Sequence, residues 1–320
     1  MMAKSVNEDQ LFIGIDGGGT KCRATIYSVK QGVLGTGLGG PANPLHGLER
    51  TLESIMVSTQ LALRDAGLPL ETVHQLYAGL GLAGVNLPSL YDKIMEWEHP
   101  FKQMFLTTDL HTACIGAHEG SDGAVIITGT GSCGFSCVNG RTTNFGGHGF
   151  ALGDKGSGAW MGLEAVKATL LDLDGLGEET NLTNVITEHF AADNAMAIVE
   201  KMSGQPSSSF AKLARYVFEA ANNNDKVAVS IVKEGADYVS KLAQRLLENN
   251  PPRLSMIGGL AEPLNKWLAE DIAKRVESHL LDPLRDLTCH PQPERLSPFQ
   301  NYPKRVFSIF WTLCCCCFLK

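Results

Sequence analysis

The sequence predicts an α/β protein of two similarly folded lobes, the second of them rich in helix. Three observations lead to this prediction. The chain has 320 residues, which is more than one small hydrophobic core usually organises. A strand, a glycine-rich loop and a hairpin occur in this order twice, and the second copy begins at residue 123. Between residues 155 and 279, apolar side chains recur mostly at the spacing of helices.

The first copy begins with an apolar run at residues 11–15, which has strand composition and ends at the loop Asp16-Gly-Gly-Gly-Thr20. A hairpin over residues 22–38 follows, and Pro41 and Pro44 then break the chain. The other elements expected in this half are helices at 45–66, 87–97 and 110–118 and strands at 73–80 and 103–106.

The second copy begins with a strand at 123–128, which ends at the loop Gly129-Thr-Gly-Ser132. Another hairpin follows around Asn139-Gly140, because Asn-Gly is the strongest two-residue hairpin signal. Sliding the chain by 112 residues places Asp16 on Thr128 and Thr20 on Ser132. This duplication predicts that each lobe offers one backbone loop to a shared cleft. Beyond the hairpin we expect a strand at 254–257 and helices at 158–171, 184–189, 194–202, 209–221, 226–249 and 262–279.

The composition is that of an ordinary soluble protein, with 44% hydrophobic and 19% charged residues. Lys and Arg number 27 and Asp and Glu number 34, which gives a net charge of −7 without any basic cluster. A nucleic-acid or anionic membrane partner is therefore not expected. The chain starts with charged and polar residues where a signal peptide needs an apolar core, so we expect the protein in the cytoplasm. The nine cysteines are then expected as free thiols.

Two segments match the spacing G-x-G-x-x-G, at residues 35–40 and 129–134. A dinucleotide site needs a helix directly after these glycines, but Pro41 follows the first segment and a hairpin follows the second. The phosphate-loop pattern G-x-x-x-x-G-K-[ST] does not occur in the sequence. Neither of these nucleotide-binding patterns is therefore predicted.

Glycine-rich loops between paired strands have another use. Consecutive backbone N–H groups in such a loop form an anion-binding concavity, and glycine lets phosphate oxygens approach closely. Two such loops could hold the β- and γ-phosphates of a nucleotide, although each could also be a tight turn without a ligand. The carboxylate of Asp16 suits a hydrated Mg²⁺ that bridges phosphates. The candidate phosphate-binding residues are Gly17, Gly18, Gly19, Thr20, Lys21, Gly129, Thr130, Gly131 and Ser132.

Five motifs stand in order along the chain, at residues 13–20, 107–109, 127–132, 146–157 and 257–259. They resemble the BadF/BadG/BcrA/BcrD ATPase family of the actin–hexokinase–Hsp70 superfamily, and within it the N-acetylglucosamine and glucosamine kinases. The resemblance covers about residues 11–280. It implies an actin-like ATPase fold of two ribonuclease-H-like lobes, at 1–119 and 120–280, whose interlobe cleft closes on ATP, Mg²⁺ and a sugar.

The activity implied by the resemblance is phosphorylation of the 6-hydroxyl of N-acetylglucosamine by ATP in amino-sugar catabolism, with glucosamine as the alternative substrate. Asp109, at the expected start of a helix, is the candidate base that takes the proton of this hydroxyl. An Asp at a helix start is also a common N-cap. His148 and Lys155 stand where many relatives carry Trp and Glu, so the choice between the two amino sugars stays open.

The resemblance also implies contacts for the sugar and for adenosine. Asp154 lies just before a helix, where it is expected to bind sugar hydroxyls or to cap the helix. Gly258 and Gly259 are expected beside the adenosine, and a homodimer is the implied assembly. The full set of sugar-binding candidates is Asn43, Asp109, Thr130, Gly147, His148 and Asp154.

Other classes of protein share parts of this pattern. Cys133 and Cys137 leave open an activator ATPase, which holds a [4Fe–4S] cluster between two subunits and drives an electron into a dehydratase. A transcriptional repressor is not favoured, because the ten residues before Leu11 are too few for a helix-turn-helix. Residues 281–320 lack the glycine-rich turn and closing helix of the family, and we expect an atypical, aberrant tail there.

Overall fold

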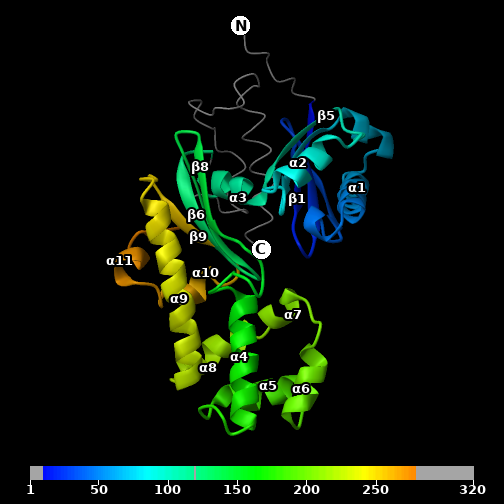
Figure 1. The fold of residues 1–320 in the computed structure, drawn as a ribbon. Coiled ribbons are helices and arrows are strands. Elements are labelled where there is room, and N and C mark those ends of the chain that lie inside the picture. Colours follow the sequence, from blue (N-terminus) through cyan, green and yellow to red (C-terminus); the bar gives the residue numbers. More distant parts are fainter. Residues whose placement is uncertain (1–9, 119, 279–320) are drawn as a thin grey trace. The chain divides into compact units, whose positions relative to one another are not determined.

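The computed structural model describes residues 10–118 and 120–278, which fall into two compact units (Figure 1). The first unit holds the chain up to Gly123 together with residues 137–141, and the second holds residues 124–136 and 142–278. Each unit is built on one five-stranded sheet with accompanying helices. The predicted α/β class with two similarly built lobes is therefore confirmed, whereas the tail at 281–320 lies outside the described residues.

The first sheet has the strand order β3-β2-β1-β4-β5. Its strands are β1 (Leu11–Gly17), β2 (Cys22–Ser28), β3 (Gly32–Gly39), β4 (Tyr77–Leu82) and β5 (Gln103–Thr108). The first three strands form an antiparallel meander, which includes the expected hairpin. β4 and β5 run parallel to β1, with Gly17 opposite Leu82 and Leu82 opposite Thr108. The carboxyl ends of β1, β4 and β5 thus share one edge of the sheet, the edge at which open α/β sheets bind ligands.

Glycines bring one helix of the first unit close to the sheet. The helices are α1 (Leu48–Asp65), α2 (Pro88–Met95) and α3 (Asp109–Ala117), with 3-10 turns η1 (Pro44–His46) and η2 (Leu70–Gln75). α1 packs on β3, where a Cβ at Gly39 would lie 2.5 Å from the carbonyl oxygen of Ser54 and a Cβ at Gly37 would collide with Ser58. The first G-x-G-x-x-G segment is therefore a strand–helix contact surface.

The second sheet repeats the topology of the first. Its strands are β6 (Gly123–Thr128), β7 (Ser132–Val138), β8 (Arg141–Gly146), β9 (Leu254–Ile257) and β10 (Val276–Glu277). The strand order is β8-β7-β6-β9-β10, which matches β3-β2-β1-β4-β5 of the first sheet strand for strand. β9 runs parallel to β6, with Ala124 opposite Leu254. The internal duplication seen in the sequence is thus a duplication of sheet topology.

Helices make up most of the second unit. They are α4 (Gly158–Leu173), α5 (Asn181–Phe190), α6 (Ala195–Met202), α7 (Ser207–Ala211), α8 (Ala214–Asn222), α9 (Lys226–Leu247), α10 (Ala261–Asn265) and α11 (Glu270–Ala273). α4, α8 and α9 pack against one another (Figure 1). α9 contributes buried apolar residues at helical spacing to the core of this unit, among them Val232, Val239 and Leu246.

Two helices expected from the sequence were wrong in extent. The helix expected at 209–221 is interrupted between α7 and α8. The helix expected at 262–279 is replaced by α10, α11 and the short strand β10. Its apolar residues do recur at helical spacing, but the backbone N–H of Ala269 donates to the hydroxyl of Ser240 on α9 at 3.0 Å. The helical pattern is already lost after Asn265, because the N–H groups of Trp267 and Leu268 donate to carbonyls three residues earlier. The contact with Ser240 then takes the place of the bond to Asn265 that a continuous helix would have.

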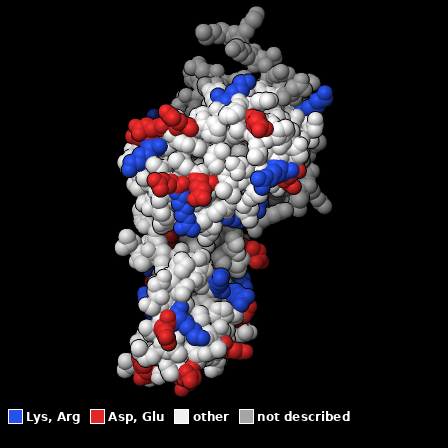
Figure 2. Space-filling view, turned by 90° about the vertical axis from the view of Figure 1, so that its right-hand side faces the viewer, with Lys and Arg blue, Asp and Glu red and all other residues white. Residues whose placement is uncertain are grey.

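The surface carries charges of both signs. On the face shown in Figure 2, Lys and Arg side chains are interspersed with Asp and Glu side chains, and no continuous basic field covers that face. Within residues 10–118 and 120–278, no helix combines the length and the apolar character that crossing a bilayer requires.

Candidate active site

The carboxyl edge of the first sheet carries two acidic side chains. Asp16 lies near the end of β1, and Asp109 directly follows β5. The pKa of Asp16 is raised from 3.8 to about 7, first by burial and then by the charge of Asp109, while Lys21 and Arg23 act in the opposite direction. A divalent cation would relieve both causes, because it replaces the lost solvation and neutralises the like charges. The donor chemistry of this edge therefore fits Mg²⁺.

Asp109 is the first residue of α3, but the helix is capped by its neighbour. The hydroxyl of Thr108 accepts a hydrogen bond from the backbone N–H of His111 at 3.1 Å. The carboxylate of Asp109 accepts one from the backbone N–H of Leu110 at 2.9 Å. Burial raises the pKa of Asp109 to about 6, although backbone hydrogen bonds lower it. Asp109 is thus an oriented carboxylate with raised basicity, as expected of a general base.

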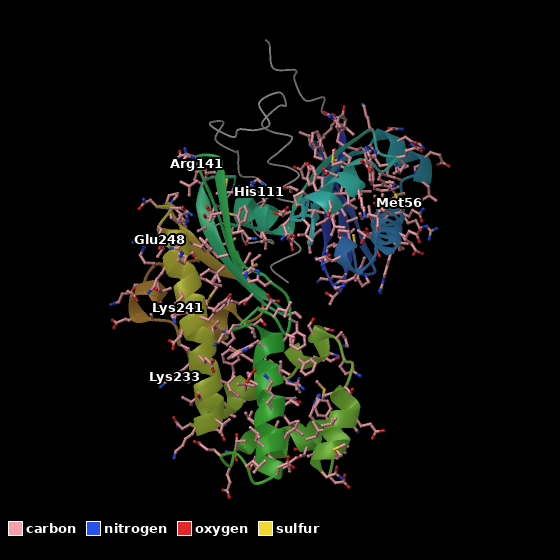
Figure 3. All side chains as sticks on the ribbon, viewed as in Figure 1. Met56, His111, Arg141, Lys233, Lys241 and Glu248 are labelled. Carbon is pink, nitrogen blue, oxygen red and sulfur yellow. The ribbon has the colours of Figure 1, made fainter. Side chains whose placement is uncertain are left out.

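The imidazole of His111 lies on the same helix (Figure 3). Its Nδ1 lies 3.1 Å from the hydroxyl oxygen of Thr107. Burial lowers the pKa of His111 to about 4, so the ring is neutral at pH 7. His111 therefore contributes no positive charge that would lower the basicity of Asp109.

The first glycine loop is fixed at one end and open at the other. The backbone N–H of Gly18 donates to the carbonyl of Lys21 at 3.0 Å, and the carbonyl of Gly18 accepts from Ala42 at 2.9 Å. Gly17 is required by packing, because a Cβ there would lie 2.5 Å from a side chain of β4. At Gly19, by contrast, a Cβ would meet nothing within 4 Å. A phosphate group therefore has room to approach the loop at Gly19.

Asn43 lies beside this loop, because the preceding residue, Ala42, is bonded to Gly18. Its Oδ1 accepts a hydrogen bond from the backbone N–H of Leu45 at 3.0 Å and so caps η1. The carboxamide packs against Gly84, just after β4, where any Cβ would collide with it. Asn43 is therefore held in a defined orientation at the carboxyl edge of the first sheet.

The second glycine loop begins after Thr128, the last residue of β6, which is fully buried. The carbonyls of Gly129 and Thr130 accept hydrogen bonds from the first two N–H groups of α4, at 2.8 and 3.3 Å. In a planar peptide the N–H points away from the carbonyl. The N–H groups of Thr130 and Gly131 therefore point away from α4, where they can meet an anion.

Asp154 links the second glycine loop to the loop 146–157. It is buried, adopts the left-handed conformation with φ +55°, and accepts a hydrogen bond from the backbone N–H of Gly149 at 3.2 Å. A Cβ at Gly131 would lie 2.8 Å from its carboxylate. Burial raises the pKa of Asp154, against the effects of Gly149 and of the exposed His148. The helix α4 is capped instead by Ser157, so capping does not explain Asp154.

Gly258 and Gly259 follow β9 and have different surroundings. Gly258 has φ +109°, and a Cβ there would collide with the carbonyl of Thr128. Gly259 has open space around it and lines a cavity of about 530 Å³. The other residues that line this cavity are His189, Ala211, Lys212, Ala214, Arg215, Phe218, Leu260 and Pro263.

The cavity has the size and lining of a nucleoside site, with apolar walls and the two cationic side chains of Lys212 and Arg215. Sequence reasoning missed both residues. A helix was expected to run through this segment, and nothing in its local pattern indicates a cavity at the break between α7 and α8.

The sequence-derived candidates divide between the two units. The first unit holds Asp16, Gly17, Gly18, Gly19, Thr20, Lys21, Asn43 and Asp109. The second unit holds Gly129, Thr130, Gly131, Ser132, Gly147, His148, Asp154, Gly258 and Gly259.

The cysteines considered for an iron–sulfur cluster are both buried. Cys133 lies beside Gly147, and burial raises the pKa of the thiol of Cys137. A cluster shared by two subunits needs cysteine sulfurs that are accessible and ionised. Burial makes the sulfur inaccessible and disfavours the charged thiolate. The surroundings of these two thiols therefore do not favour the activator ATPase.

The repeated sheet topology, with a glycine loop after the first strand of each sheet, defines an actin-like ATPase fold. The chain belongs to the BadF/BadG/BcrA/BcrD ATPase family, which matches residues 13–284. It is 33% identical over 261 residues to a glucosamine kinase of Vibrio cholerae, covering 82% of this chain and 88% of that protein. It is 28% identical over 277 residues to an N-acetylmuramic acid/N-acetylglucosamine kinase of Clostridium acetobutylicum, covering 82% of this chain and 89% of that protein.

A solved structure from Chromobacterium violaceum, provisionally described as an N-acetylglucosamine kinase, has the same fold. It superposes with a TM-score of 0.79 at 28% identity and covers 85% of this chain and 95% of its own.

Proposed function

We propose that the protein is a cytoplasmic kinase that transfers the γ-phosphoryl group of ATP to the 6-hydroxyl of N-acetylglucosamine. The product is N-acetylglucosamine 6-phosphate, and the role is in amino-sugar catabolism. The glucosamine kinase and the N-acetylmuramic acid/N-acetylglucosamine kinase each match 82% of the chain, and these relatives support a sugar kinase. The observation that carries the mechanism is the buried, oriented carboxylate of Asp109 at the carboxyl edge of the first sheet.

Asp109 acts as the general base. It receives the proton of the sugar hydroxyl as the oxygen attacks the terminal phosphorus and the bond from this phosphorus to the leaving ADP breaks. With a pKa of about 6, the carboxylate is mostly ionised at pH 7 and is more basic than an exposed Asp. Asp16 would hold Mg²⁺ through water, and the cation would supply charge neutralisation for the transferred phosphoryl group.

The two glycine loops bind the phosphates, one from each lobe, with residues 1–119 and 120–280 as the lobes. Backbone N–H groups of Gly19, Thr130 and Gly131 supply the hydrogen bonds, and Thr20 and Lys21 stay part of this predicted set. The N–H of Gly18 is already bonded to the carbonyl of Lys21, and the hydroxyl of Ser132 to the carbonyl of Lys155, so neither of these two groups contacts the phosphates. Gly259 and the cavity beside it take the adenosine, with Lys212 and Arg215 facing the ribose and the innermost phosphate.

The sugar is bound by groups from both lobes. Asp154 accepts hydrogen bonds from two sugar hydroxyls, and the amide nitrogen of Asn43 donates to another. Thr130 stands where the phosphate loop meets the sugar, and the exposed Gly147 and His148 complete the site. Oriented contacts of this kind hold the acceptor hydroxyl in line with the phosphorus.

Glucosamine is the second candidate substrate. The relative with 33% identity is a glucosamine kinase, and the one with 28% identity acts on N-acetylated sugars by its name. The ammonium group of glucosamine needs a carboxylate or a carbonyl, whereas the acetamido group needs a small apolar niche and one amide partner. The nearby carboxylate of Glu234 is paired with Lys155 at 2.5 Å, which weakens its attraction for an ammonium.

A coupled ADP-release assay with N-acetylglucosamine, glucosamine, glucose and no sugar tests the proposal. We expect fast ADP release with N-acetylglucosamine and little without sugar. Asp109→Asn should abolish the sugar-dependent release, while the exposed Asp92→Asn, in the same unit, should leave it unchanged. Equal ADP release in all four arms would show an ATPase of another kind, and iron in the purified protein would support the activator.

A further inference from the structure

Ser132 connects the loop that we assign to phosphate with the loop that we assign to sugar. Its hydroxyl donates to the backbone carbonyl of Lys155 at 2.8 Å. Its own backbone carbonyl accepts from the N–H of Gly147 at 3.1 Å. We propose that Ser132 is the positioning residue through which sugar binding strengthens nucleotide binding, and the reverse. This inference rests on the proposed function and assigns a coupling to its two sites.

The hydroxyl of Ser132 uses its proton in the hydrogen bond to Lys155. A phosphate oxygen only accepts hydrogen bonds, so a serine side chain that binds phosphate must donate its single proton. In Ser132 that proton lies on the bond to the carbonyl of Lys155, and the side chain is only 2% exposed. Turning the hydroxyl to a phosphate would leave the carbonyl of Lys155 without this partner, which costs free energy at this part-buried position.

Further contacts connect the second glycine loop with the loop 146–157 within the second unit. The carbonyl of Gly129 accepts from the N–H of Gly158, just beyond the loop 146–157, at 2.8 Å. Gly131 packs against the carboxylate of Asp154, where a Cβ would lie at 2.8 Å. The second glycine loop is therefore connected to both ends of the loop 146–157 and to the carboxylate of Asp154, which we assign to the sugar.

One end of the loop 146–157 is anchored on α9. Gly156 packs against the backbone of Gly235, and the ammonium group of Lys155 is paired with Glu234. The neighbouring Lys233 and Lys241 project from α9 into solvent (Figure 3). The segment 147–152 is mostly exposed, so it is the part that a sugar would order.

Ordering of this segment is the physical basis of the coupling. A sugar held by Asp154 and Gly147 restricts the loop 146–157, and the bonds of Ser132 pass the restriction to the second glycine loop. The nucleotide that binds next loses less conformational entropy, which appears as tighter binding. The coupling must be reciprocal, because both ligands bias the same ordered arrangement.

The test is a binding cycle. The affinity of the full-length protein for a non-hydrolysable ATP analogue with Mg²⁺ is measured by calorimetry, with and without N-acetylglucosamine. In the wild type we expect the sugar to tighten analogue binding about fivefold or more. In Ser132→Ala the ratio should fall to within about twofold, with the affinity for the analogue alone little changed. Ser132→Thr, which keeps the hydroxyl, should retain the coupling.

Ser136→Ala is the matched control. Ser136 is buried on the same strand, and its hydroxyl accepts a hydrogen bond from Asn249 at 3.1 Å, away from both loops. This variant should keep the full ratio. Two results would overturn the inference: a ratio of one in the wild type, or an unchanged ratio in Ser132→Ala, whether or not this variant loses affinity for the analogue alone.

A second measurement needs no variant. The analogue alone should slow amide hydrogen exchange in the loop 146–157 of the wild-type protein, and no change in exchange there would also overturn the inference. The outcome for the proposed function is separate, because it depends on ADP release. A wild type that phosphorylates the sugar but shows no coupling removes only the role of Ser132.

Discussion

The charge of Asp109 helps to raise the pKa of Asp16 to about 7, although the two residues stand at the ends of strands that are separated by β4. Burial is the larger cause for both carboxylates. Ionising the two carboxyl groups at this edge of the sheet therefore costs free energy. Such a pair is typical of a site that binds a cation and transfers a proton.

Binding of Mg²⁺ with the nucleotide should release a proton near pH 7. The cation prefers the ionised carboxylate of Asp16, so the apparent Mg²⁺ affinity is expected to fall about tenfold for each pH unit below 7. Calorimetry in two buffers with different ionisation enthalpies measures the released proton. Asp16→Asn should eliminate the release, and a release that persists in this variant would contradict the assignment.

Asp16→Asn should also stabilise the fold at alkaline pH. The folded-state pKa of about 7 lies above the unfolded value of 3.8, so stability is lost as pH rises from about 4 to about 7. The amide avoids this loss, and we expect a gain of about 1–4 kcal/mol at pH 8 and little change at pH 4. Urea unfolding at both pH values provides the measurement. Equal destabilisation at both would argue against a strained carboxylate.

The acidic limb of the pH–rate profile should report Asp109. A general base works only when it is deprotonated, so kcat/KM at saturating Mg²⁺ is expected to fall as pH drops through about 6. Asp109→Asn should lower kcat by about 10²–10⁴-fold and remove this limb from the residual activity. A limb that survives unchanged in the variant belongs to another group.

Gly258 and Gly259 should respond differently to the same substitution. Gly258→Ala places a Cβ at φ +109° and against the carbonyl of Thr128, so a loss of about 2 kcal/mol or more is expected. Gly259→Ala meets open space and should change stability by about 0.5 kcal/mol at most, while raising the KM for ATP. Denaturant unfolding and steady-state kinetics distinguish the two effects. Similar stabilities for both variants would contradict the packing assigned to Gly258.

Arg215→Ala should weaken ATP binding without affecting the sugar. The guanidinium group lies 4.5 Å from the ring centre of Tyr216, and this stacking holds the side chain at the cavity. We expect the KM for ATP to rise about tenfold and the KM for N-acetylglucosamine to stay constant, since one charged hydrogen bond is lost. Lys233→Ala, exposed on α9, is the control for removal of a positive charge. A change confined to the sugar KM would move the adenosine site elsewhere.

Local patterns predicted some parts of this chain and failed at others for identifiable reasons. The hairpin around Asn139-Gly140 was predictable, because a two-residue turn is decided by its own backbone preferences. The helix expected over 262–279 was wrong, because α10 ends at Asn265 and a distant residue, Ser240, then accepts the N–H of Ala269 that a continuous helix would bond to Asn265. The cap of α3 was also undecidable from the sequence, since Thr108 and Asp109 are both good capping residues.

The sequence by itself determined the duplicated strand–loop–hairpin plan, the two glycine loops and the candidate carboxylates, because spacing and residue type are local properties. Only the tertiary structure decided which groups are buried, and hence the raised pKa values of Asp16 and Asp109. It also decided the bonds of Ser132 and the cavity beside Gly259. These features depend on solvent exclusion and on contacts between residues far apart in the chain, which no local pattern records.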